Sequence, residues 1–272
     1  MTKKSFAMRV ITFIVTAAAI LVSSSVLRGQ GTSRTLVAVW AHADDEAPVG
    51  PVLARYAREG VQVYMIIATD GAQGAANTSV PRGPEIAKLR VEEAKCSAQA
   101  LGIQAPILLG FPDGALGNYN ADPTMLFRLT QSIQEQLQRL RPDALITWGP
   151  DGGYGHPDHR IVSSIVTQLV RAGAPGVPQR LFYASIPAEG IRAMNPTRGA
   201  PPFVLPQANL FTLRVRFGEA DLEAARHSMA CHQTQAPREA VDRVIAAMRE
   251  VWKGELPLSP MWPQTPSDDL FR

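Results

Sequence analysis

The chain has 272 residues, 46% of them hydrophobic and 19% charged, a globular composition that excludes a disordered, collagen-like or coiled-coil protein. The formal net charge is +3, but residues 1–30 hold four basic residues and no acidic one, which leaves 23 basic and 24 acidic residues in the rest. Because nucleic-acid binding needs a basic surface on the folded part, a nucleic-acid partner is not expected.

Residues 1–30 have the pattern of an export signal. A basic stretch, MTKKSFAMRV, is followed by the apolar run ITFIVTAAAILV and then by small residues. This order is typical of a secretory signal peptide. An uncleaved membrane anchor is the alternative, although a spanning helix usually needs about 20 mostly apolar residues. We therefore expect an exported protein, periplasmic or extracellular, with membrane contact only through an uncleaved leader, and a single domain over residues 31–272.

Apolar runs and amphipathic stretches alternate along the rest of the chain. The pattern predicts strands at residues 35–40, 61–68, 106–111, 144–148, 180–186 and 210–215. It predicts helices at 51–59, 86–101, 125–140 and 158–171, a Pro- and Gly-rich surface loop at 188–207, and two helices at the end. Strands separated by helices predict an α/β fold of three layers, Rossmann-like, with helices on both faces of a mostly parallel sheet. The expected strand order is 3-2-1-4-5 or similar.

Residue types that bind metals gather in two motifs. The segment 41–46 (AHADDE) follows the first predicted strand, and the segment 154–159 (YGHPDH) follows the fourth; together they hold three of the five His. In a doubly wound sheet the strand order reverses between these two strands, and ligands bind outside their carboxyl ends. We therefore expect the two motifs to face each other across a crevice.

The side chains of the two motifs suit metal-assisted hydrolysis. A catalytic zinc takes three His or carboxylate ligands and keeps a position for water, and His42, Asp45 and His159 could supply the three. Zinc lowers the pKa of that water to about 7, and Asp44 could accept its proton. Each motif alone is more often a solvated loop, a helix N-terminus or a surface turn than a site, so it is their pairing that favours a metal site.

Three further residues could act on the developing oxyanion. His156 and Tyr154 could donate hydrogen bonds to it, and Asp158 could fix the tautomer of His156. Elsewhere, Cys96 and Cys231 leave two alternatives open: a disulfide, which an exported protein allows, or two buried free thiols.

AHADDE followed at a distance by HPDH resembles the PIG-L/LmbE-type family of zinc-dependent de-N-acetylases. Shorter segments extend the similarity: TDGAQG at 69–74, LRVEE at 89–93, FPDG at 111–114 and ACHQTQ at 230–235. The resemblance covers roughly residues 35–236. The family's first motif is usually AHPDDE, so Ala43 stands where a Pro is common, and Ala72-Gln73 stands in place of an acidic segment.

The resemblance implies a function and a set of site residues. The implied metal ligands are His42, Asp45 and His159, the implied general base is Asp44, and the implied oxyanion-stabilising or acid residue is His156 beside Tyr154, while Arg90 and Asp113 would line the sugar pocket. The implied reaction removes the acetyl group from an N-acetylated amino sugar, a GlcNAc-type glycoside, glycolipid or glycoconjugate. The cofactor would be Zn²⁺ or another divalent metal such as Fe²⁺. The alternatives are a zinc hydrolase of another amide or ester, and a metal-binding relative without catalysis.

Overall fold

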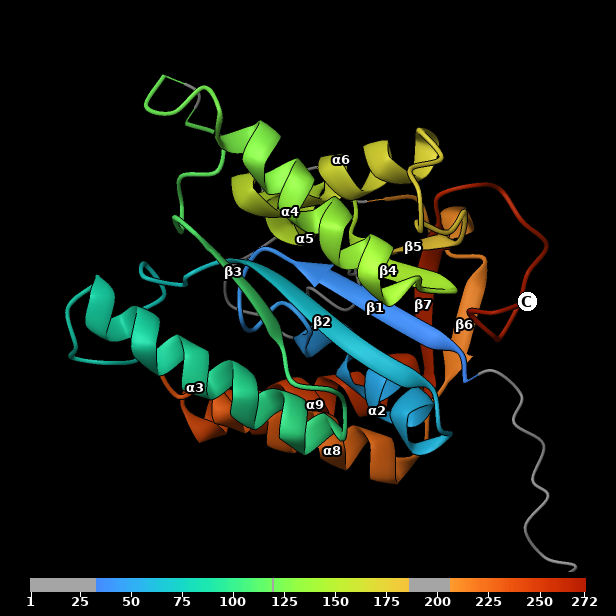
Figure 1. Ribbon diagram of the computed structural model, residues 1–272. Helices are drawn as coiled ribbons and strands as arrows, with labels where there is room; N and C mark the ends of the chain where they lie inside the picture. The colour runs from blue at the N-terminus through green and yellow to red at the C-terminus, as the bar shows by residue number, and fades with distance from the viewer. Residues whose placement is uncertain (1–32, 119, 186–205) are drawn as a thin grey trace, which may run out of the picture. The chain divides into compact units, whose positions relative to one another are not determined.

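The computed structural model describes residues 33–118, 120–185 and 206–272 (Figure 1). Its strands are β1 (Thr35–Trp40), β2 (Gln62–Thr69), β3 (Ile107–Phe111), β4 (Ala144–Trp148), β5 (Leu181–Ala184), β6 (Leu213–Arg216) and β7 (Glu255–Pro260). They form a seven-stranded sheet in the order β3-β2-β1-β4-β5-β7-β6. The first five strands run parallel, and β7 lies antiparallel to both β5 and β6. The predicted order, with its reversal between β1 and β4, is confirmed.

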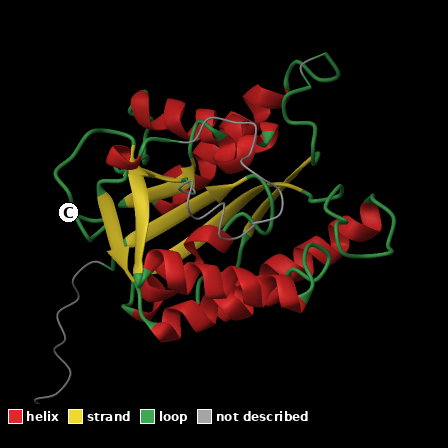
Figure 2. Ribbon diagram, turned by 180° about the vertical axis from the view of Figure 1, so that it is seen from behind, coloured by secondary structure: helices red, strands yellow, loops and turns green. Residues whose placement is uncertain are grey.

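Helices cover both faces of the sheet (Figures 1 and 2). One face carries α4 (Met125–Leu140), the short α5 (Gly152–Gly155) and α6 (Pro157–Arg171). The other face carries α2 (Gly50–Arg58), α3 (Pro84–Leu101), α8 (Glu219–Cys231) and α9 (Arg238–Trp252). Two short 3-10 turns, η1 (Ala47–Val49) and η2 (Ala208–Leu210), complete the described elements. The prediction of three layers is confirmed.

The central strand β1 contributes to both hydrophobic cores. Leu36, Ala38 and Trp40 belong to the core beneath α2, α8 and α9, whereas Val37 and Val39 belong to the core beneath α4 and α6. Successive side chains of a strand point to opposite faces of the sheet. A strand covered on both faces therefore reads as one continuous apolar run, as TLVAVW does.

Two helices were predicted at the end of the chain, but α9 is followed by a strand, β7, that was not predicted. β7 (ELPLSP) carries Pro257 and Pro260, and it lies between β5 and β6. Proline donates no ladder hydrogen bond and normally argues against an interior strand. The predicted leader at 1–30 and nearly all of the predicted loop at 188–207 lie outside the described residues. Among the residues that are described, no helix is both long and apolar enough to cross a bilayer.

A disulfide joins the two helices that pack side by side on one face. Cys96 in α3 and Cys231 at the end of α8 are bonded, with their Cα atoms 5.8 Å apart. The alternative of two free thiols is therefore wrong. Helical periodicity placed each cysteine on a helix but could not show that the two helices are neighbours.

Candidate active site

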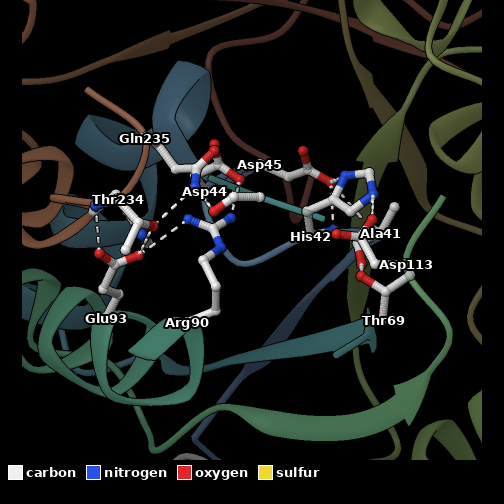
Figure 3. Close-up of polar contacts among 12 residues, drawn as sticks. Ala41, His42, Asp44, Asp45, Thr69, Arg90, Glu93, Asp113, Thr234 and Gln235 are labelled. Atoms are coloured by element: carbon white, nitrogen blue, oxygen red, sulfur yellow. Dashed lines mark hydrogen bonds and ion pairs between the residues drawn. The ribbon is translucent and has the colours of Figure 1, made fainter. Parts of the chain in front are cut away.

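The two motifs meet at the carboxyl ends of β1 and β4. Nδ1 of His42 lies 3.0 Å from Nε2 of His159, and Oδ1 of Asp45 lies 2.9 Å from the same Nε2. The second oxygen of Asp45 accepts the backbone N–H groups of Ala41 and His42 at 3.0 and 2.9 Å. Three candidate ligand atoms from two distant segments thus converge on one point; Figure 3 shows His42 and Asp45 of the first motif.

The ring of His159 is fixed from behind. Its Nδ1 lies 3.0 Å from the carbonyl oxygen of Gly152, to which it can only donate, so Nε2 keeps a free lone pair for a metal. Trp148 stacks on the ring with centroids 4.9 Å apart and planes 3° from parallel. Burial, stacking and this hydrogen bond together set the direction of Nε2.

The ring of His42 is oriented by carboxylates on its far side. Its Nε2 lies 3.1 Å from Oδ1 of Asp113 and 3.5 Å from Oδ2 of Asp158, and makes a well-aligned hydrogen bond with neither. Burial lowers the pKa of His42, but Asp113, Asp158 and Asp45 outweigh it and raise that pKa to about 12. The carboxylates of Asp113 and Asp158 face Nε2 and favour a proton there. The neutral ring that a metal requires therefore has its lone pair on Nδ1, the atom turned toward His159.

The donor set fits a transition metal. Two imidazole nitrogens and a carboxylate oxygen are the ligands of catalytic zinc sites, whereas Mg²⁺ and Ca²⁺ prefer oxygen alone. His156 brings a third imidazole within 4.8 Å of His42 and His159, and His42, Asp113 and Asp158 form a second such group among the described residues. His42, Asp45 and His159 could hold a metal between them, because Asp113 and Asp158 already face the opposite nitrogen of His42.

Asp44 lies beside the ligands but has different surroundings. Its side chain is 36% exposed, and its Oδ1 accepts a hydrogen bond from Nη2 of the buried Arg90 at 2.6 Å. Burial raises the pKa of Asp44, but the charge of Arg90 outweighs this and holds it below its usual range. Asp44 is therefore an ionised carboxylate at neutral pH, open to solvent. The predicted contact of Arg90 with a sugar stays a prediction.

His156 and Tyr154 lie at the same edge. Nδ1 of His156 accepts the backbone N–H of Asp158 at 3.2 Å, at the start of α6. Burial and the neighbouring rings of His159 and His42 lower the pKa of His156. The neutral ring then carries its proton on Nε2, free to donate. Tyr154 is half exposed, and its ring centre is 5.1 Å from that of His159.

The expected role of the Asp158 carboxylate is corrected. It accepts the backbone N–H groups of Gly114 and Leu116 at 2.8 and 3.3 Å and faces His42. Only the backbone N–H of Asp158 contacts His156. Asp158 lies in the first turn of α6, and its carboxylate points across to the loop after β3. Asp113, expected at the sugar pocket, likewise faces His42.

Sequence reasoning missed a set of residues behind Arg90. Nη1 of Arg90 donates to Oε2 of Glu93 at 3.1 Å, and Glu93 accepts the N–H and the hydroxyl of Thr234 at 2.7 and 2.8 Å. On the other side, a Cβ at Gly71, whose φ is +70°, would lie 3.0 Å from Cβ of Arg90. These residues fall in segments 69–74, 89–93 and 230–235, the segments that extend the resemblance to the family beyond the two motifs.

Comparisons with known proteins agree with this site. The family described as PIG-L: GlcNAc-PI de-N-acetylase matches residues 37–170. A 1D-myo-inositol 2-acetamido-2-deoxy-alpha-D-glucopyranoside deacetylase of Rhodococcus jostii (strain RHA1) is 32% identical over 244 residues, covering 75% of this chain and 82% of the relative. The chain belongs to the PIG-L family of de-N-acetylases.

Solved structures show the same fold. An N,N'-diacetylchitobiose deacetylase of Pyrococcus horikoshii is similar with a TM-score of 0.58 and 18% identity, over 86% of this chain and 88% of that one. A 4-carboxy-2-hydroxymuconate hydratase of Pseudomonas putida KT2440 is similar with a TM-score of 0.55 and 17% identity, over 85% of this chain and 98% of that one. Because the second is a hydratase, the fold does not decide the reaction, and the argument must come from the site.

Proposed function

We propose that the protein is a zinc-dependent N-deacetylase that hydrolyses the acetamide of an N-acetylated amino sugar. The observation that carries the proposal is the convergence of His42, Asp45 and His159, with a solvent-open carboxylate, Asp44, as the next residue. A metal store would need the three ligands alone. An ionised base and a neutral His with a free N–H beside them are the parts of a hydrolase.

The residues divide the work of the reaction. A divalent metal held by His42, Asp45 and His159 would supply a Lewis acid that polarises the carbonyl and lowers the pKa of water. Asp44 accepts the proton of the attacking water. Nε2–H of His156 and the hydroxyl of Tyr154 donate to the oxygen of the tetrahedral intermediate. Asp44 gives the proton it accepted to the nitrogen as the C–N bond breaks, so that the free amine and acetate are the two products.

The substrate class is supported by the relatives. The Rhodococcus jostii relative is named as a deacetylase of a 2-acetamido-2-deoxyglucopyranoside linked to inositol, and the Pyrococcus horikoshii protein as a deacetylase of diacetylchitobiose. Both names describe an N-acetylated amino sugar that is part of a larger molecule. We propose a small-molecule or glycan substrate of this kind for the present chain.

Product analysis tests the proposed reaction. The purified protein is incubated with N-acetylglucosamine, N-acetylglucosaminyl-inositol and diacetylchitobiose, and acetate and free amine are measured separately. A deacetylase releases the two in equal amounts. Acetate without amine would indicate ester hydrolysis, and cleavage of the glycosidic bond without acetate would contradict the proposal.

We also propose that the protein is exported. Two independent features support this: the basic and apolar leader in residues 1–30, and the Cys96–Cys231 disulfide, since disulfides persist mainly in oxidising compartments. Expression of the full chain in its host, followed by fractionation and mass analysis of the N-terminus, tests this. We expect protein outside the cytoplasm, cleaved near residue 30 or retained in the membrane fraction. Reduced, full-length protein in the cytosol would contradict it.

A further inference from the structure

A continuous line of contacts leads from the base to the end of α8. Arg90 donates hydrogen bonds to Asp44 and to Glu93, and Glu93 accepts a hydrogen bond from the hydroxyl of Thr234 (Figure 3). Arg90 and Thr234 are 3% and 5% exposed. A guanidinium buried in this way has no water to turn toward, so its direction depends on the partners that hold it. Nη1 of Arg90 donates to Glu93, and because the guanidinium is planar and rigid, this contact directs Nη2 toward Asp44.

The disulfide ties the same two segments together one turn further on. Cys96 follows Glu93 by three residues on α3, and Cys231 precedes Thr234 by three residues at the end of α8. Glu93 and Cys96 are three residues apart on α3 and so lie on the same face of that helix, whereas Thr234 lies in the turn that follows Cys231. The Glu93–Thr234 hydrogen bonds and the Cys96–Cys231 bond therefore both join this face of α3 to the C-terminal end of α8 and the turn after it.

We propose that Glu93 and Thr234 are positioning residues for Asp44, acting through Arg90, and that the Cys96–Cys231 disulfide keeps them in register. This rests on the proposed function, in which Asp44 is the base. A carboxylate that must accept a proton in the transition state loses much of its effect when it moves by about 1 Å. The set of Arg90, Glu93, Thr234 and the disulfide, here termed the positioning unit, prevents that movement.

The disulfide is open to a reductant. Cys96 is exposed, and the bond lines a cavity of about 730 Å³ together with Glu93 and Thr234. A water-soluble trialkylphosphine can break the S–S bond: the phosphine gives up two electrons and becomes its oxide, water supplies the oxygen and two protons, and two thiols result. A phosphine is preferred to a dithiol because thiolates are themselves zinc ligands.

The helices should stay paired after reduction. Ala98, Leu101, Leu222 and Ala225 are buried between α3, α8 and the helices around them. The side chain of Glu46 also accepts hydrogen bonds from Ser97 and Ser228, one on each helix. Loss of the disulfide should therefore loosen the end of α8 rather than unfold the domain. This separates a positioning effect from a general loss of structure.

The test compares turnover, KM and metal content in matched variants. Thr234→Val removes the hydroxyl that donates a hydrogen bond to Glu93, and Thr234→Ser keeps that hydroxyl. The double variant Cys96→Ser/Cys231→Ser removes the disulfide. Thr167→Val is the control, because Thr167 lies on α6 and its hydroxyl pairs with the Tyr183 hydroxyl at 2.8 Å, on the other face of the sheet. Assays run well below each variant's unfolding midpoint.

We expect kcat to fall about tenfold in Thr234→Val and in the double cysteine variant, with KM within about twofold and metal content unchanged. Thr234→Ser and Thr167→Val should keep wild-type kcat. Phosphine should lower the kcat of the wild type to that of the double variant and leave the double variant unaffected, with two thiols titrated in the wild type alone.

Three results would overturn the proposal. Wild-type kcat in Thr234→Val and in the double variant, at full metal content, shows that the unit does not position the base. A loss of kcat that follows metal loss shows that it supports the ligands instead. An equal loss in Thr167→Val shows a general effect of stability. Failure of the proposed function is seen separately, as a wild-type protein that retains metal and releases no acetate from any substrate.

Discussion

Three consecutive acidic residues have three different surroundings. Asp45 is buried and faces His159, Asp44 is partly exposed beside Arg90, and Glu46 is fully buried between α3 and α8. The chain is in a tight turn after β1, so single-residue steps change the direction of the side chain. In the proposed function, these adjacent positions would supply a metal ligand (Asp45) and a base (Asp44), while Glu46 accepts hydrogen bonds from both helices.

The first prediction concerns the base. Asp44→Asn keeps the size of the side chain and a carbonyl oxygen for Arg90 but removes the proton acceptor. We expect bound metal to be unchanged and kcat to fall by about 10²- to 10⁴-fold. Metal content and steady-state kinetics check this together. Near-normal turnover in the variant would show that another group accepts the proton.

The second prediction separates ligands from the oxyanion donor. His159→Ala should abolish metal binding, because the Nε2 of His159 is one of the converging atoms. His156→Ala should keep the metal and lose about 10²- to 10³-fold in kcat, as for the loss of one oxyanion donor. Isothermal titration with Zn²⁺ measures the first and kinetics the second. Loss of metal from His156→Ala would make His156 a ligand.

At this scale the sequence identified residue types but not all of their partners. His42, Asp45 and His159 converge as the motif spacing and the switch point predicted. The contacts of Asp113 and Asp158 with His42 depend on how the loop after β3 folds over β1. That packing is a tertiary property with no local pattern. Asp113 was therefore predicted to line the sugar pocket and Asp158 to fix the tautomer of His156, and neither was predicted to face His42.

At the scale of the elements, the loop between β4 and α6 packs against the ring of Trp148. Gly153 has φ +71°, and a Cβ there would lie 2.5 Å from the Trp148 ring, which in turn stacks on His159. Only glycine allows this backbone and this approach at once. The close contact ties the shape of the loop to the direction of a metal ligand.

The third prediction follows from that contact. Gly153→Ala should displace Trp148 and weaken Zn²⁺ affinity by about tenfold or more, the scale seen when groups supporting a ligand are lost. Gly173→Ala is the control, because Gly173 also has a positive φ, +61°, but no atom lies within 4 Å of its Cβ position. It should lose stability and keep its metal affinity. Equal affinities in both variants would contradict the role of Trp148.

The fourth prediction concerns the junction of α3 and α8. Nε2 of His232 contacts Oε1 of Glu46 at 2.8 Å; burial lowers the pKa of His232, but Glu46 outweighs it and raises that pKa above its ordinary 6.5. A raised folded-state pKa adds stability that is complete below the unfolded-state pKa and is lost as pH rises through the folded-state value.

Thermal unfolding of the wild type and of His232→Gln measures this effect. The advantage of the wild type over the variant should be largest below about pH 6.5, the ordinary pKa of His, and shrink as the pH rises above it. Glutamine keeps a hydrogen-bond donor for Glu46 without a titrating charge. A difference that grows with pH would contradict a charged His232 in the folded protein.

Helices and strands were predicted accurately where the apolar periodicity and the residues at the ends of the element agreed. Helix α4 begins and ends at the predicted residues 125 and 140, since its apolar period and the following Arg141-Pro142 agree. Strand β7 was missed because its two prolines contradict the strand pattern. Its place in the sheet comes from pairing with β5 and β6, which only the tertiary fold supplies.

Over the whole molecule, the site depends on the strand order. Strands β1 and β4 are neighbours although about a hundred residues separate them, and both motifs leave the sheet at the same edge. Open α/β sheets bind ligands at such a reversal of strand order. The α3–α8 face adds the disulfide and the positioning unit on the side of the base, so both faces of the sheet support one site.

Metal-dependent acetate release tests the central claim most directly. The purified protein is assayed on N-acetylglucosaminyl-inositol as it is, after removal of metal by a chelator, and after addition of Zn²⁺ to the stripped protein. The account predicts release that stops on chelation and returns with Zn²⁺, and Asp44→Asn should release acetate at least about 10²-fold more slowly than the wild type in both metal-containing states. Release that continues unchanged in fully metal-free protein would contradict it.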